Sequence, residues 1–332
     1  MTPVDIVARP SATEFADSTR LTRHPFVVRG LAAQWPAVIA AAQGDEAVSR
    51  YLLSFDAKQL LDVKIAPTSA DGRFFYTPDL RGLNFNSQAV LLERFLEHLL
   101  MLRTAIDAPT LYVQSTPVSK ALPGFAAANV NPLLGNNVSP RIWIGNQTRV
   151  ATHFDVADNL AIVVAGHRRF ILFPPDQVQN LYVGPLDFTL AGQPVSLVDP
   201  VAPDFSRYPK FATALESALV ADLEPGDAIY IPSPWWHHVQ ALARFNILVN
   251  SWWREAPADA GTPFNLIVHG LLALRHLPVE ERAAWRSLFE HYVFESNGDP
   301  AGHLPEHARS VLGPMTEDLA RHLKLWLGKQ LA

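Results

Sequence analysis

The chain has 332 residues, with 48% hydrophobic and 18% charged residues, which is ordinary for a globular protein and excludes disorder on the scale of the whole chain. Its formal net charge of −5, without a dense run of Lys or Arg, argues against a protein that grips nucleic acid through its phosphates. Because it has no cysteine, disulfides, thiolate metal sites and iron–sulfur clusters are excluded, and any metal must be held by His, Asp, Glu or Asn.

Residues 1–110 predict a mixed segment of strands and helices that packs on the part that follows. Strands are expected at 25–31, 60–65 and 72–76, and a helix at 89–102, where Leu and Phe recur at helical spacing. The first residues contain no apolar stretch long enough for a signal peptide, and no segment of the chain approaches a membrane span. We therefore expect a soluble cytoplasmic protein.

Residues 111–255 predict a mainly β core, because short apolar strands follow one another with Gly and Pro between them. The expected strands are 111–114, 141–145, 159–164, 168–173, 227–232 and 245–253. This succession is typical of a barrel or sandwich. Residues 185–215 form a long Pro- and Asp-containing loop, and loops of this length often have a function.

Residues 256–332 are expected to be helical, with Pro278 opening one helix and Thr316 capping another. Each predicted helix carries an apolar stripe, made of Trp285, Leu288, Phe289 and Tyr292 in the first and of Leu319, Leu323 and Trp326 in the second. Such apolar stripes must be buried against another surface. They pack either on the barrel or on the same helices of a second subunit, and we favour a homodimer.

A metal site is predicted from two separate motifs. His153 and Asp155 lie two residues apart on an expected strand, so both side chains point to the same face. One imidazole and one carboxylate can occupy adjacent positions of an octahedral metal, and a third ligand would complete the facial triad that suits non-haem iron(II). That ligand is expected from a distant strand, where His237 and His238 follow a pair of tryptophans. Each motif is weak by itself, and their combination is far more specific.

Three strings carry a resemblance to a known family: THFD, then NLAIVVAGHRRFILFPPDQ, then GDAIYIPSPWWHHV. They resemble the JmjC/cupin-8 oxygenases, which depend on Fe(II), 2-oxoglutarate and dioxygen. Within that family they are most similar to the asparaginyl hydroxylase branch represented by factor inhibiting HIF. The resemblance runs from about residue 110 to residue 253, and more weakly over 24–38. It implies a double-stranded β-helix core, of the cupin or jelly-roll type, flanked by N-terminal α/β elements and a C-terminal helical segment.

The resemblance also implies roles for individual residues. The iron ligands would be His153, Asp155 and His237, with His238 facing outward or packing structurally. The residues beside 2-oxoglutarate would be Tyr112, Asn159, Arg168 and Asn250. Gln114 and Trp252 would contact the substrate, and Trp252 would also form a hydrophobic shell together with Trp235 and Trp236.

Two positions depart from the asparaginyl hydroxylase pattern. Arg168 stands where that branch has lysine, and it can bind the far carboxylate of 2-oxoglutarate with two hydrogen bonds instead of one. Arg169 has the opposite strand parity and is expected in solvent. Val150 replaces a threonine, which removes one hydroxyl from the co-substrate site. Thr148 and Thr152 are the candidates to supply it instead.

The function implied is the hydroxylation of a protein or peptide side chain. Two alternatives stay open: an oxygenase of a small molecule or a modified nucleoside, and a metal-binding cupin that oxidises nothing. The acidic pI argues against a nucleic-acid substrate. A carboxylate clamp of Arg168 and Tyr112 argues against a cupin without oxidative chemistry. Histone demethylation is less favoured, because the chain has no chromatin-reader module.

Overall fold

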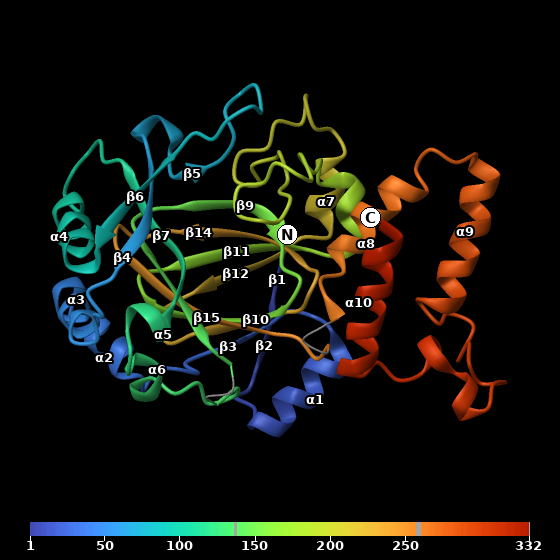
Figure 1. Cartoon of the computed structure of the whole chain (residues 1–332). Helices are drawn as coiled ribbons and strands as arrows, with labels where there is room; N and C mark the ends of the chain where they lie inside the picture. The colour runs from blue at the N-terminus through green and yellow to red at the C-terminus, as the bar shows by residue number, and fades with distance from the viewer. Residues whose placement is uncertain (136–137, 257–259, 332) are drawn as a thin grey trace. The chain divides into compact units, whose positions relative to one another are not determined.

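The computed structural model describes residues 1–135, 138–256 and 260–331. Contacts within the chain divide it into two units, Met1–Trp253 and Arg254–Ala332. The first unit contains two β-sheets and seven of the helices described below (Figure 1).

The smaller sheet has six strands in the order β1-β12-β11-β14-β9-β5. Their bounds are β1 (Thr2–Pro3), β12 (Leu219–Leu223), β11 (Arg168–Phe173), β14 (Trp236–Ala241), β9 (Arg149–Phe154) and β5 (Arg73–Phe74). The four central strands are antiparallel to one another, whereas β1 pairs parallel with β12 at one edge and β5 pairs parallel with β9 at the other. This sheet carries the predicted metal ligands.

The larger sheet has nine strands in the order β2-β3-β13-β10-β15-β8-β7-β4-β6. Their bounds are β2 (Asp5–Val7), β3 (Phe26–Val28), β13 (Ala228–Ile231), β10 (Asp158–Ala165), β15 (Asn246–Trp253), β8 (Pro140–Gly145), β7 (Thr110–Pro117), β4 (Leu60–Ala66) and β6 (Asn86–Leu91). Strands from the first 110 residues therefore extend the sheet at both of its edges.

Strand β10 shows how the core is layered. All eight of its residues are buried, because the strand is covered on both faces. Ala161 and Val163 pack in one apolar cluster with residues of the smaller sheet, such as Phe170. Ile162 and Val164 belong to a second cluster on the opposite face. The two sheets thus face each other across a shared core, which confirms the predicted mainly β jelly-roll with flanking helices.

The outer face of the larger sheet is covered by helices (Figure 1). The helices of the first unit are α1 (Ala12–Thr22), α2 (Pro36–Ala42), α3 (Asp45–Leu53), α4 (Leu92–Leu102), α5 (Val118–Ala121), α6 (Phe125–Ala128) and α7 (Phe211–Glu216). Helix α4 shows the principle, since Leu92, Phe95, Leu96 and Leu99 form its buried stripe at the spacing of one helical face.

The predicted helix at 89–102 was wrong in its first turn. The structure places Ala89 and Val90 in β6, where they pair with Asp62 and Leu61 of β4, and the helix begins only at Leu92. Pairing with β4 overrides the local helical spacing, because an edge strand gains a full ladder of backbone hydrogen bonds there.

The second unit is helical, as expected, with α8 (Phe264–Ala273), α9 (Val279–Tyr292) and α10 (Glu317–Leu331). Pro278 directly precedes α9, and the Thr316 hydroxyl accepts a 3.2 Å hydrogen bond from the Leu319 amide at the start of α10. No side chain of α8 or α9 is buried. Among the described residues, no helix combines the length and apolarity that a bilayer crossing requires.

Candidate active site

The structure brings the three predicted metal ligands together. His153 is on β9, Asp155 follows that strand directly, and His237 is on β14. The two strands are neighbours, with His153 and His237 in direct register and their ring centroids 4.3 Å apart. One ligand atom from each of the three side chains lies within 4.8 Å of the others. This is a spacing that a single metal ion can bridge.

Backbone carbonyls orient both imidazoles. Nδ1 of His153 lies 2.9 Å from the Ala151 carbonyl oxygen, and Nδ1 of His237 lies 3.1 Å from that of Trp235. A proton on each Nδ1 would leave Nε2 as the lone-pair donor for a metal. Burial and the neighbouring His153 lower the pKa of His237 to about 4, against the opposing effect of Asp155. The neutral ring that a metal needs is therefore the stable form at neutral pH.

A chain of hydrogen bonds ends on the Asp155 carboxylate. Its Oδ2 accepts from Trp252 Nε1 at 2.9 Å and from Asn159 Nδ2 at 3.4 Å. Asn159 Oδ1 accepts from Asn250 at 3.0 Å, and Asn250 Oδ1 accepts from Trp143 Nε1 at 2.6 Å. Asn159, Asn250 and Trp252 thus fix the carboxylate, in addition to any contact with a ligand. The sequence reasoning missed Trp143, whose inward direction depends on the register between β8 and β15.

A cavity of about 160 Å³ opens beside the three ligands. Each residue predicted to bind co-substrate or substrate lines it: Tyr112, Gln114, Asn159, Arg168, Asn250 and Trp252. The same cavity is lined by residues that the sequence reasoning did not single out, among them Phe74, Phe85, Ser115, Leu190 and Gln193. The last two belong to the segment predicted as a loop at 185–215, so this segment forms part of the cavity wall; the loop prediction was wrong at its end, because α7 begins at Phe211.

Arg168 is the most unusual residue of the cavity. Its side chain is on β11 and the residue is only 1% exposed. Its Nε and Nη2 atoms have no hydrogen-bond partner among the residues that the structure describes. Burial lowers the pKa of Arg168, which the nearby Tyr112 partly opposes. A buried guanidinium without acceptors is costly unless a ligand supplies them, and a carboxylate matches its geometry.

Tyr112, on β7, lies close to Arg168. Burial raises the pKa of Tyr112 to about 12, so its phenol stays protonated at neutral pH and can donate a hydrogen bond. The arginine and the tyrosine come from different sheets, yet both line the same cavity. Together they offer a cation and a neutral donor to an anionic group.

Neither Thr148 nor Thr152 supplies the missing threonine hydroxyl to the cavity. Val150 lines the cavity, whereas Thr148 and Thr152 are not among its lining residues. Both threonines are buried, and their hydroxyls lack a partner within the described part of the chain. β9 does not alternate regularly here, because its pairing with β14 has a register irregularity between Val150 and His153, and both of these residues line the cavity.

The remaining predicted positions lie outside the cavity. Arg169 forms a two-pronged ion pair with Asp222, at 2.7 and 3.0 Å, on the exposed side of β11. His238 is buried on the opposite face from His237 and does not line the cavity. Trp235 and Trp236 pack in apolar clusters of the core, so of the three tryptophans only Trp252 reaches the cavity.

Comparison with known proteins places this site in a family context. Residues 11–259 match the family described as "Cupin-like domain". The chain is 37% identical over 109 residues to tRNA wybutosine-synthesizing protein 5 of Danio rerio. The matched segment covers 33% of this chain and 30% of that protein. It is 31% identical over 119 residues to HSPB1-associated protein 1 of Homo sapiens, covering 35% and 24%. It is 32% identical over 118 residues to lysine-specific demethylase JMJ31 of Arabidopsis thaliana, covering 35% and 21%.

Each of these matches spans less than a third of the relative's own length. The relatives support the broader resemblance to cupin-like, JmjC-type proteins. They do not single out the asparaginyl hydroxylase branch.

Proposed function

This chain belongs to the cupin-like domain family, and from that membership we propose that it is an Fe(II)- and 2-oxoglutarate-dependent oxygenase that hydroxylates a protein or peptide side chain. The observation that carries the proposal is Arg168, a buried cation without a described acceptor in a cavity that also holds the three ligand atoms. A metal-binding cupin without oxidative chemistry has no need for such a cation.

The residues present fit both groups. His153, Asp155 and His237 would hold the metal, and two histidines with one carboxylate are the donor set that suits non-haem Fe(II). Arg168 and Tyr112 would bind the far carboxylate of 2-oxoglutarate. When bound, these groups supply oxidising power, with dioxygen as the oxidant and conversion of 2-oxoglutarate to succinate and carbon dioxide.

The chain's own residues provide orientation and a dry environment. Trp252 and Asn159 hold the Asp155 carboxylate in place. The aromatic side chains of Phe74, Phe85 and Trp143 line the cavity and exclude water from the reacting centre. Gln114 lines the same cavity, and it would hydrogen-bond to the substrate.

A second candidate substrate is a modified nucleoside of tRNA. It is favoured by the name of the zebrafish relative, whose matched segment is 37% identical to this chain. The net charge of −5 weighs against it, because tRNA binding normally draws on a basic surface. Succinate formation from 2-oxoglutarate, measured with total tRNA in one assay and with a peptide library in another, distinguishes the two substrates.

The first test is an anaerobic titration of the Fe(II)-loaded protein with 2-oxoglutarate, followed by the visible metal-to-ligand charge-transfer band. We expect the band in the parent and its loss in His153→Ala, which removes one ligand. Arg168→Gln serves as the second variant, expected to retain the metal but to require far more 2-oxoglutarate. An iron-loaded parent that develops no band would contradict the proposal and favour a cupin without oxidative chemistry.

A further inference from the structure

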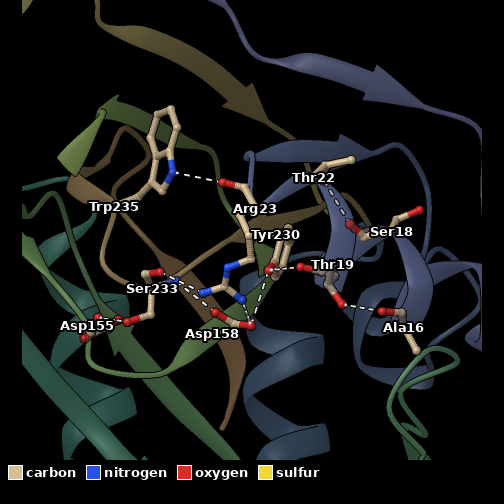
Figure 2. Close-up of polar contacts among 10 residues, drawn as sticks. All are labelled: Ala16, Ser18, Thr19, Thr22, Arg23, Asp155, Asp158, Tyr230, Ser233 and Trp235. Atoms are coloured by element: carbon tan, nitrogen blue, oxygen red, sulfur yellow. Dashed lines mark hydrogen bonds and ion pairs between the residues drawn. The ribbon is translucent and has the colours of Figure 1, made fainter. Parts of the chain in front are cut away.

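The two segments that carry the metal ligands meet at a third segment of the chain. Residues 155–158 run from the end of β9 into the first residue of β10, beginning with Asp155 and ending with Asp158. Residues 232–235 join β13 to β14 and lead into His237. Arg23, at the C-terminal end of α1, contacts both segments (Figure 2).

The contacts form a closed ring of three residues. Arg23 donates from Nη1 to Asp158 Oδ2 at 2.7 Å and from Nη2 to the Ser233 carbonyl at 2.8 Å. The Ser233 amide donates to Asp158 Oδ1 at 2.9 Å. The Tyr230 hydroxyl also lies 3.3 Å from Asp158 Oδ2 (Figure 2). The Asp158 carboxylate, only 8% exposed as a residue, is therefore held from both sides.

Each side of this ring continues to one metal ligand. On one side, the Ser233 hydroxyl donates to the Asp155 carbonyl at 2.8 Å. On the other, Trp235 Nε1 donates to the Arg23 carbonyl at 3.2 Å, and the Trp235 carbonyl lies 3.1 Å from His237 Nδ1. The spacing between Asp155 and His237 thus depends on how Arg23 holds the two loops.

The backbone of Arg23 supports a role beyond packing. Its φ of +44° lies in the left-handed region, which favours glycine after a helix because any Cβ is crowded there. An arginine at this position carries a conformational cost, and such strained positions cluster at functional sites. The cost is understandable if the guanidinium is needed for the ring, since glycine could make the same turn without it.

We propose that Arg23 is a positioning residue for the metal centre, acting with Asp158 to hold Asp155 and His237 at the spacing that one metal ion requires. The inference rests on the proposed metal site, but it does not depend on 2-oxoglutarate or on the identity of the substrate. Outer contacts of this kind commonly change metal affinity by about 10- to 100-fold.

The test is Arg23→Gly in the full chain, with Co(II) as the probe. Glycine removes the guanidinium and relieves the left-handed backbone, so the fold is expected to survive. The dissociation constant for Co(II), measured by calorimetry, should rise about tenfold or more, and the visible Co(II) spectrum should change as the ligand spacing relaxes. The Tm of the metal-free protein should change no more than in the control.

The matched control is Lys58→Gly. Lys58 is also a cation at positive φ, +57°, and it is paired with Asp56 at 3.3 Å, on the loop between α3 and β4. It should lose an ion pair and gain backbone freedom in the same way, but bind Co(II) like the parent. An Arg23→Gly protein with the parent's Co(II) affinity and spectrum would overturn the inference.

A second variant tests the same inference in case Arg23→Gly does not fold. Asp158→Asn keeps the size of the side chain and removes its charge, so the Arg23 ion pair is lost. We again expect weaker Co(II) binding, and an unchanged affinity would overturn the inference. A parent that does not bind Co(II) would instead contradict the proposed metal site, so the two failures are distinguishable.

Discussion

Arg168 is the residue at which stability and function are most clearly opposed. Its burial without a described acceptor destabilises the empty protein, because part of the guanidinium has lost water and gained nothing. The same feature prepares the cavity for an anion. Replacing this residue should therefore move stability and ligand binding in opposite directions.

Arg168→Met keeps much of the length of the side chain and removes the charge. We expect it to stabilise the metal-free protein by about 2 kcal/mol, measured by urea unfolding, and to abolish the stabilisation that 2-oxoglutarate gives the Fe(II)-loaded parent. Arg169→Met, one residue away on the exposed face, is the control and should do neither. A less stable Arg168→Met protein would show that the guanidinium already has partners in the empty cavity.

At the scale of elements, the site depends on the pairing of β9 with β14 and on the turn that leads from β10, in the larger sheet, to β11, in the smaller sheet. The pairing aligns His153 with His237, and the turn brings Arg168 to the same cavity. Gly166 lies in this turn, with φ +75°. A Cβ at this position would meet the Phe245 carbonyl oxygen at 2.5 Å and also the Asn246 side chain.

Gly166→Ala is expected to destabilise the protein by about 3 kcal/mol, because left-handed strain adds to a clash with backbone that cannot move easily. Gly192→Ala is the matched control, since its φ is +105° but a Cβ there would meet nothing within 4 Å. It should cost about 1 kcal/mol. Urea unfolding of both variants measures the difference, and equal losses would mean that the turn between β10 and β11 tolerates the extra atom.

At the scale of the whole molecule, the question is what covers the apolar side chains of the second unit, Arg254–Ala332. Its helices carry large apolar side chains, yet none is buried in α8 or α9, and in α10 only Ala320 is. A helix rich in apolar residues gains its stability mainly from packing. We therefore retain the proposal that these helices pair with those of a second copy in a homodimer.

The proposal predicts a dimer of the 36.7 kDa chain in sedimentation velocity. Leu272→Glu, on α8, should shift the protein toward monomer, because it places a charge in the expected interface. Leu21→Glu is the control, as Leu21 is an exposed apolar residue of α1 in the other unit. A dimer that persists in Leu272→Glu with the parent's affinity would count against pairing through α8.

The sequence by itself indicated the type of fold and the three candidate ligands. Period-two alternation makes His153 and Asp155 share a face, and the succession of short strands is typical of a barrel or sandwich. The choice of His237 over His238, and of a jelly-roll, came from the family resemblance. Local signals likewise placed Pro278 before a helix and Thr316 at a helix cap.

Tertiary structure decided what depends on partners distant in sequence. The start of α4 shifted to Leu92 because β6 pairs with β4. The hydrogen-bond chain from Trp143 to Asp155 exists only through the register of β8, β15 and β10. The ring of Arg23, Asp158 and Ser233 joins three segments that no local pattern connects. Local propensity acts within a few residues, whereas these contacts depend on which strands and loops the folded core brings together.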